Sequence, residues 1–255
     1  MEFEPIMGTG TQACQTYSGA TGCTTGVCDG CAVREQSVCG KLPQDALLEL
    51  HQIGRHRMLR KGQTLVWEGD ETLMVANVMS GMVKLSSGTS TGTEQILGVV
   101  GPSGFIGRPN GGPSGHSIVA LVDTKLCVFP AAPFRRFMEV HPEMGVALLD
   151  KAFDDLDHAR RWQLMLARAS ASERTASLLL EFTGTRIVEG RTYIFPLSRG
   201  QMADLAGLTI ETISRQLTKL KKAGIISLPS RNGFVIHDRE ALAAIAGEVP
   251  HSGLH

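Results

Sequence analysis

The pattern of apolar and polar positions changes twice along this chain of 255 residues. A short helical stretch is expected from about Leu42, with Pro43 where a first helical turn tolerates proline. Between residues 58 and 130, apolar and polar residues alternate in short runs that glycine-containing turns separate. The clearest runs are residues 64–67, 82–85, 95–99, 117–120 and 126–129. Short strands at this spacing predict an antiparallel sandwich or roll.

Helical spacing follows from His141 to about Leu166. Six positions three and four residues apart have the a/d spacing of a helix seam: Leu149, Ala152, Leu156, Ala159, Gln163 and Leu166. This stripe could pack on the domain of the helix itself or pair with a second copy of the chain. Charged residues on the other faces, among them Asp154 and Arg160, favour the seam, and we therefore expect a dimerisation helix.

The last third of the chain predicts a winged helix-turn-helix. Ser198 and Gln201 have the spacing of a capping box, and the helix that they start should end at Gly207. Thr209 can cap a second short helix. The apolar face of that helix consists of Ile213, Leu217 and Leu220. Two short helices joined by a tight turn form a helix-turn-helix, and Asn-Gly at residues 232–233 between two apolar runs predicts the hairpin of a wing.

Polar residues of the second helix suit contacts with double-stranded DNA. Glu211, Ser214 and Arg215 lie in its amino-terminal half, the end that enters the major groove. Arginine can donate two hydrogen bonds to guanine, and glutamate can accept from a cytosine amino group. Further candidates for base or backbone contacts are Thr209, Thr212, Lys219 and Lys222. A polar helix face can also be merely solvated, but the position between a capped helix and a wing favours DNA readout.

Composition and net charge do not change the prediction that the second helix reads DNA. Hydrophobic content of 42% and charged content of 20% fit an ordinary soluble protein, and 25 basic residues balance 25 acidic ones. A neutral chain can still carry a local basic patch. The first thirty residues lack the pattern of a signal peptide, and no stretch has the length of a membrane span, so we expect a cytoplasmic protein without membrane contact.

The cysteines form the second chemical feature. Cys28, Cys31 and Cys39 read C-x-x-C-x₇-C, and Cys127 lies alone in a later apolar run. Three closely spaced thiols in a reducing compartment suit a metal ion or an iron–sulfur cluster, either of which needs a fourth ligand. Structural zinc could use the same thiolates, and spacing alone does not separate the two. A lone strand cysteine is ordinarily a buried apolar residue.

Several motifs resemble one family. The sequence at residues 205–217, LAGLTIETISRQL, resembles the recognition motif of the CRP/FNR regulators, and its E-x-x-S-R pattern resembles the FNR-type branch. Residues 61–70 and 80–85 resemble the family's sensory β-roll, and Ala-Ser-Glu-Arg at residues 171–174 resembles its entry to the DNA-binding domain. The family's nucleotide binders carry a Gly-Glu and an Arg-Ser or Arg-Thr pair that residues 105–118 lack, so we expect no cyclic nucleotide.

The resemblance implies an α+β fold. It comprises an N-terminal antiparallel β-roll like that of cyclic-nucleotide-binding domains, a long dimerisation helix and a C-terminal winged helix-turn-helix. The expected divisions are a cysteine-rich cluster-binding segment at residues 1–40, the β-roll at 41–140, the dimerisation helix at 141–170, the DNA-binding domain at 171–240 and a tail at 241–255.

The resemblance also implies site residues. In the FNR-type branch four cysteines hold a 4Fe–4S cluster, and the matching positions here are Cys28, Cys31, Cys39 and Cys127. The seven-residue gap before Cys39 resembles the FnrN/FnrL-like subgroup of alphaproteobacteria, whereas Cys14 and Cys23 lie outside the pattern. The base contacts of the family map onto Glu211, Ser214 and Arg215, in half-sites that resemble TTGAT.

The leading hypothesis is therefore an oxygen-responsive transcription regulator. A homodimer with an intact cluster would bind palindromic DNA, contact RNA polymerase and act as an activator of anaerobic or microaerobic gene expression. The alternative is a zinc-stabilised or thiol-redox regulator of the same fold that does not sense oxygen through a cluster. An enzyme is not expected, because no nucleophile elbow, phosphate loop or HExxH motif is present.

Overall fold

A computed structural model describes residues 28, 30–88, 94–184, 188–189, 192–230 and 233–247. Its first part contains the 3-10 helix η1 (Val38–Lys41), helices α1 (Gln44–Ile53) and α2 (Ala131–Val140), and a set of strands between the two. The strands are β1 (Arg55–Leu59), β2 (Thr64–Val66), β3 (Met74–Ser80), β4 (Val83–Gly88), β5 (Glu94–Val100), β6 (Phe105–Ile106), β7 (Ser117–Ala120) and β8 (Thr124–Pro130).

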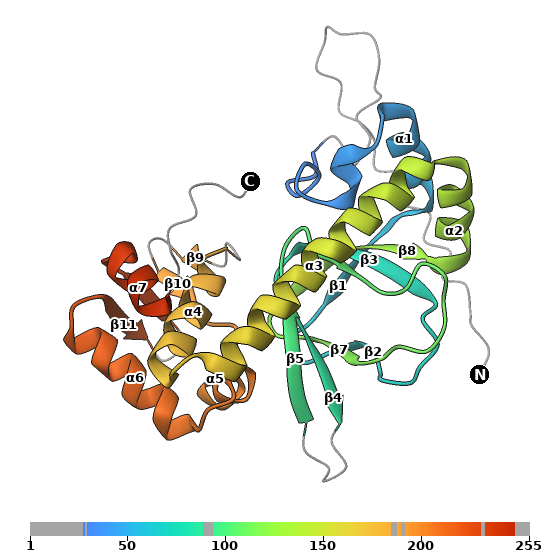
Figure 1. The fold of residues 1–255 in the computed structure, drawn as a ribbon. Helices are drawn as coiled ribbons and strands as arrows, with labels where there is room; N and C mark the ends of the chain where they lie inside the picture. Colours follow the sequence, from blue (N-terminus) through green and yellow to red (C-terminus); the bar gives the residue numbers. More distant parts are fainter. Residues whose placement is uncertain are drawn as a thin grey trace, which may run out of the picture.

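These strands form two facing sheets, the β-roll of Figure 1. One sheet has the order β1-β8-β3-β6 and the other β2-β7-β4-β5, with antiparallel pairing between neighbours. Side chains alternate between the two faces of a strand. Val78 and Leu126 therefore point into the core between the sheets, whereas Val75 and Phe129 point outward into a second core under the helices. Cys127, next to Leu126, also packs against this outer core.

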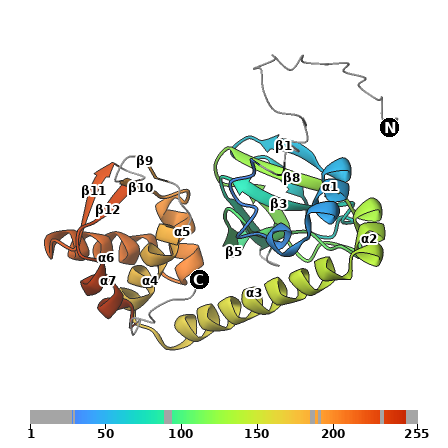
Figure 2. The same ribbon diagram turned by 90° about the horizontal axis from the view of Figure 1, so that it is seen from above.

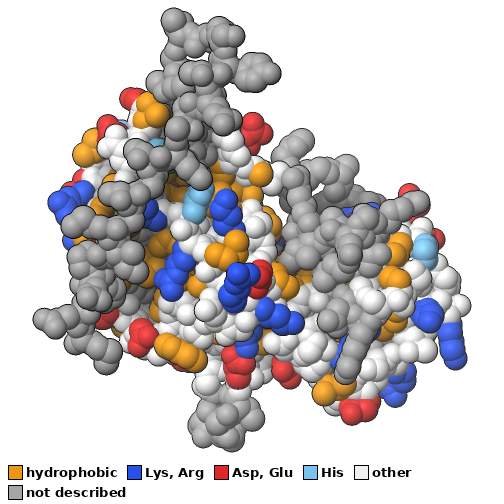
Figure 3. Space-filling model, turned by 180° about the vertical axis from the view of Figure 1, so that it is seen from behind, with side chains coloured by type: hydrophobic (Ala, Val, Ile, Leu, Met, Phe, Trp, Pro, Cys, Tyr) orange, Lys and Arg blue, Asp and Glu red, His pale blue; other side chains and the backbone are white. Residues whose placement is uncertain are grey.

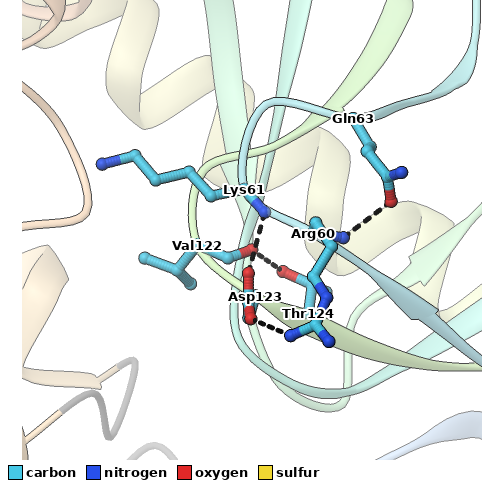
Figure 4. A network of polar contacts seen from close by, with 6 residues as sticks. All are labelled: Arg60, Lys61, Gln63, Val122, Asp123 and Thr124. Atoms are coloured by element: carbon cyan, nitrogen blue, oxygen red, sulfur yellow. Dashed lines mark hydrogen bonds and ion pairs between the residues drawn. The ribbon is translucent and has the colours of Figure 1, made fainter.

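A polar network joins the β1–β2 turn to the β7–β8 turn (Figure 4). The Asp123 carboxylate accepts hydrogen bonds from Arg60 Nη1 (2.8 Å) and from the Lys61 backbone N–H (2.9 Å). The hydroxyl of Thr124 donates to the Val122 carbonyl (2.8 Å) and accepts from the Met82 N–H (3.0 Å). Because Thr124 is the first residue of β8, these contacts fix the start of the strand that carries Cys127.

Helix α2 was not predicted as a separate element. The strand pattern ends at Pro130, and the helix begins directly after it. Its apolar residues Phe134 and Phe137 are buried, three positions apart, in the outer core. Pro133 and two adjacent arginines make the helical signal short, so that tertiary packing, rather than the local sequence, determines this helix.

Helix α3 (Pro142–Arg168) is the long connection between the two parts of the molecule. It runs beside the β-roll and ends at the DNA-binding part, and one of its flanks faces away from both (Figure 2). This is the helix that the seam pattern predicted. No helix among the described residues is long and apolar enough to cross a membrane.

The second part is a winged helix-turn-helix. It consists of α4 (Ala171–Gly184), β9 (Val188–Glu189), β10 (Thr192–Ile194), α5 (Arg199–Ala206), α6 (Ile210–Lys222), β11 (Ile226–Ser230), β12 (Gly233–Ile236) and α7 (Arg239–Ala246). The strands form one sheet in the order β11-β12-β10-β9. Ser198 and Gln201 form the predicted capping box, and Gly207 ends α5 in the left-handed conformation. The predicted fold class is confirmed, whereas the turn residues Arg231 and Asn232 lie outside the described residues.

Candidate functional site

The predicted DNA-reading residues share one face of α6. Thr209 caps the helix, and its hydroxyl accepts from the Thr212 N–H (3.2 Å). Glu211, Ser214 and Arg215 are exposed. The opposite face consists of the buried residues Ile213, Leu217 and Leu220. One face anchors the helix while the other leaves the candidate reading residues free to enter a groove.

Charge is arranged along α6 as the helix dipole favours. Glu211 lies in the first turn, where its own backbone N–H and the Thr209 hydroxyl hold the pKa of its carboxyl below the usual range. Lys219, Lys221 and Lys222 lie in the last turn and are exposed. Lys and Arg side chains are visible along the outer edge of the DNA-binding part (Figure 3), a local basic surface in a chain without net charge.

Arg199 is a candidate that the sequence reasoning missed. It is the first residue of α5, and its guanidinium carbon lies 5.5 Å from the centre of the Phe195 ring. Burial lowers the pKa of Arg199, and its buried Nη1 has no hydrogen-bond partner among the described residues. An arginine directly after the predicted cap Ser198 was the available signal.

Three of the predicted ligand cysteines lie on one coiled segment. The Cys31 N–H donates to the Cys28 carbonyl (3.3 Å), and the Leu42 N–H donates to the Cys39 carbonyl (3.2 Å). Gly40 allows this coiling, because a Cβ atom there would lie 2.6 Å from the Glu35 carbonyl oxygen. Cys14 and Cys23 lie outside the described residues.

Cys127, in β8, brings the fourth thiol from the sheet. Its strand neighbours are His56 on β1 and Asn77 on β3. The amide Nδ2 of Asn77 lies 3.3 Å from Cys39 Sγ, so that Asn77 connects the sheet position beside Cys127 to the cysteine segment. Asn77 is buried, and its Oδ1 has no hydrogen-bond partner among the described residues. A role for Asn77 was not predicted, because it depends on strand register.

The four thiols are close enough to influence one another. Burial, together with the nearby Cys28 and Cys31, raises the pKa of Cys39 to about 11. Burial, together with the nearby Cys39, Cys28 and Cys31, raises the pKa of Cys127 to about 12. None of these four cysteines forms a disulfide. The thiols of Cys39 and Cys127 are therefore neutral near pH 7, and a bound cation would have to displace their protons.

Helix α3 presents an exposed apolar stripe. Its members are Val146, Leu149, Phe153, Leu156 and Leu164, which are 43 to 64% exposed. Leu149 and Leu156 belong to the predicted seam. Of the other predicted seam residues, Ala152, Ala159 and Gln163 are exposed beside the stripe and Leu166 is half-buried. Phe153 could have been found from its spacing of four residues after Leu149.

The cysteine segment rests on the first turns of α3. Val38 and Leu42 pack in the same buried cluster as Met144 and Ala147 of α3. Lys41 Nζ lies 2.5 Å from Asp150 Oδ2, an exposed ion pair next to Leu149. The cysteine segment is therefore in direct contact with the helix that carries the apolar stripe.

Comparison with known proteins identifies both parts of the chain. Residues 173–245 match the family model of the Crp-like helix-turn-helix domain, and residues 56–141 match that of the cyclic nucleotide-binding domain. The chain is 36% identical over 234 residues to the transcriptional activator protein FnrL of Cereibacter sphaeroides, a match that covers 89% of this chain and 94% of FnrL. The chain belongs to the CRP/FNR family.

Other CRP/FNR proteins agree with this assignment. The nitrogen fixation regulation protein FixK of Bradyrhizobium diazoefficiens is 33% identical, over 86% of this chain and 93% of FixK. The structure of FixK2 from Bradyrhizobium japonicum has a TM-score of 0.70 at 27% identity and covers 76% of this chain and 97% of FixK2. This CRP/FNR protein is therefore a DNA-binding transcription regulator, as its helix-turn-helix motif predicted.

The donor set in this CRP/FNR chain fits a 4Fe–4S cluster. Such a cluster takes four thiolates, each bound to a different iron, and the structure brings four half-buried thiols into one neighbourhood. Among the described residues, no group of three His, Cys, Asp or Glu side chains converges as one metal ion requires.

Proposed function

We propose that this protein is an oxygen-responsive transcription activator that works as a homodimer and holds a 4Fe–4S cluster on Cys28, Cys31, Cys39 and Cys127. The observation that carries the proposal is the contact of the cysteine segment with α3. The same short stretch supplies Cys39, Lys41 and Leu42, so that a thiol ligand, an ion pair with α3 and a buried contact with α3 are only a few residues apart.

The cysteines would tie two separate parts of the chain together. Cys28, Cys31 and Cys39 would hold the group from the coiled segment, and Cys127 would hold it from the sheet. When bound, the group would supply iron–thiolate bonds that oxygen can break. Joining the cysteine segment to the sheet would keep Val38 and Leu42 packed against α3. Loss of this connection would free the segment and weaken the arrangement of α3 that pairs with a second copy.

The exposed stripe supports the homodimer. Large apolar residues of α3 such as Phe153 and Leu156 are exposed. One flank of this helix faces away from both parts of the chain (Figure 2). Pairing two α3 helices would bury these residues and place two copies of α6 on the same side of DNA. Glu211, Ser214 and Arg215 would then read half-sites resembling TTGAT, one helical turn apart. RNA polymerase is the further partner that an activator at such sites requires.

Anaerobic purification tests the proposal. Iron and acid-labile sulfide are measured together with the visible spectrum, and sedimentation and operator affinity are measured before and after exposure to air. We expect a brown protein that binds a TTGAT palindrome as a dimer and loses both properties in air. Cys127→Ser should abolish the colour, whereas the matched variant Cys23→Ser should keep it.

Two results would contradict the proposal. A colourless protein that contains zinc would favour the alternative of a zinc-stabilised regulator. Equal operator affinity before and after exposure to air would contradict the proposed oxygen response, even if the protein holds a cluster.

A further inference from the structure

We propose that Arg174 is a positioning residue that fixes the angle between α3 and the helix-turn-helix, and thereby the half-site spacing that the protein accepts. The inference rests on the homodimer in the proposed function. It does not depend on the nature of the group held by the cysteines.

Arg174 lies in the first turn of α4 and donates hydrogen bonds to two other helices. Its Nη2 donates to the carbonyl of Leu166 (2.7 Å) and its Nε to that of Ala169 (2.9 Å), both at the end of α3. Its Nη1 donates to the carbonyls of Ala206 and Gly207 (3.3 Å each), both at the end of α5. All four acceptors are main-chain oxygens of helix ends.

The end of an α-helix leaves carbonyl groups without partners and carries partial negative charge. Here two such ends meet at one guanidinium, which satisfies carbonyls of both and neutralises their repulsion. The planar fork of arginine can hold donors toward both ends at once, whereas the ammonium of lysine is a point charge on a flexible stem. Arg174 is therefore a fixed joint between α3 and α5, and Lys at this position would keep the charge but not the joint.

This joint lies immediately before the recognition helix. Gly207 occupies the turn of the helix-turn-helix, with φ of 60°, and Thr209 caps α6 two residues later. A Cβ atom on Gly207 would lie 3.3 Å from Arg174 Nη1 and 3.5 Å from Leu166 Cδ2, so the turn is in direct contact with both the joint and α3. Holding the turn against the end of α3 fixes the direction in which α6 leaves.

A second contact holds the same end of α5 from the other side. Gln95 Nε2, in β5, donates to the carbonyl of Asp204 (3.1 Å), and Ile96 packs in the same buried cluster as Leu205. Gln95 thus connects α5 to the β-roll, whereas Arg174 connects it to α3. In a dimer built on α3, the distance between the two recognition helices depends on the Arg174 joint.

The test compares operators that carry identical half-sites at different spacings. Full-length protein, purified anaerobically, is titrated with DNA in which the wild-type optimum spacer is lengthened or shortened by one base pair, and with a single half-site. We expect the affinity of the wild type to fall by roughly tenfold or more when the spacer has the wrong length, which is the scale of one mismatched base pair. Arg174→Lys and Arg174→Gln should reduce this loss to about threefold or less, with half-site affinity unchanged. Arg168→Gln, which removes a charge from the exposed last turn of α3, serves as the matched control and should keep the wild-type profile.

Unchanged affinity for a single half-site also shows that a variant still folds. If Arg174→Gln does not fold, Arg174→Lys still provides the test, because it retains the charge and the aliphatic stem. A wild-type spacer profile in Arg174→Lys would overturn the positioning role and leave the proposed function intact. A wild-type protein that tolerates all spacers equally would overturn the homodimer of the proposed function and this inference together.

Discussion

Replacing Asn77 with leucine should have opposite effects on the metal-free and the cluster-loaded protein. The buried amide of Asn77 makes one hydrogen bond, from Nδ2 to Cys39 Sγ at 3.3 Å, and its buried Oδ1 makes none among the described residues. Burial raises the pKa of Cys39 to about 11, so the metal-free thiol is neutral and the hydrogen bond is weak. An unsatisfied buried acceptor costs about 1–3 kcal/mol, more than the roughly 0.5–1.5 kcal/mol that a neutral hydrogen bond contributes.

Asn77→Leu removes both the unsatisfied acceptor and the hydrogen bond to Cys39, and it keeps a similar side-chain volume. We therefore expect the free energy of unfolding of the metal-free protein to stay constant or to rise by about 1 kcal/mol. In the loaded protein Cys39 would be a thiolate, and a hydrogen bond to a charged group contributes about 1.5–3 kcal/mol. Loss of that bond should speed the decay of the visible absorbance in air by roughly tenfold or more.

Urea unfolding under anaerobic reducing conditions measures the first quantity, and the decay of absorbance after mixing with air-saturated buffer measures the second. Val78→Ala serves as the control, because Val78 is buried on the same strand but points into the core between the sheets. It should lower the free energy of unfolding by about 1–3 kcal/mol without a specific effect on the decay. If Asn77→Leu behaved like Val78→Ala, its contact with Cys39 would be ordinary packing, and the reasoning would fail.

Phe153→Glu should weaken the dimer by roughly hundredfold or more, because two exposed phenylalanines that each contribute about 1.5–3 kcal/mol would no longer be buried; sedimentation equilibrium measures this, and an unchanged dissociation constant would place the interface elsewhere. Arg215→Ala should cost about 1–3 kcal/mol at the cognate site and relax base preference, whereas Lys222→Ala should weaken all sequences alike and lower the salt slope by about one; intact discrimination in Arg215→Ala would refute the readout. In the metal-free protein, Cys39 and Cys127 should react slowly with iodoacetamide at pH 8 and faster as pH approaches their pKa values of about 11 and 12. Rapid labelling at pH 8 would contradict the burial of these two thiols. Because the pKa values of Cys39 and Cys127 lie above those of unfolded thiols, the two thiols contribute stability that is complete below about pH 9 and is lost as pH rises toward 11–12.

The elements of the DNA-binding part could be predicted closely, because their signals are local. The capping box of Ser198 and Gln201, the left-handed Gly207 and the cap Thr209 each depend on residues within one helical turn. The same is true of the buried and exposed faces of α6. Such signals survive without knowledge of the rest of the fold.

The β-roll and the cysteine site depend on contacts between distant residues. Helix α2 follows from the packing of Phe134 and Phe137 under the sheet, and the pairing of β8 with β3 places Asn77 beside Cys127. Spacing indicated a site at Cys28, Cys31 and Cys39, but only the resemblance to a family pointed to Cys127. The predicted seam of α3 includes Leu149 and Leu156 of the exposed stripe but not Phe153, because the pattern of alternate steps of three and four leads from Leu149 to Ala152.

The two ends of α3 have different partners, and this limits the route by which the cysteine site can act. The first turns of α3 pack against Val38 and Leu42 of the cysteine segment. Its last turn is joined by Arg174 to the turn before α6. The β-roll also reaches α5 directly through Gln95, but this contact lies in β5, on the sheet that does not contain Cys127. In the proposed function, a signal from the cysteines would therefore travel along α3, whose exposed stripe a second copy would cover. Dimerisation and the direction of α6 would then respond together, because one rigid helix carries both.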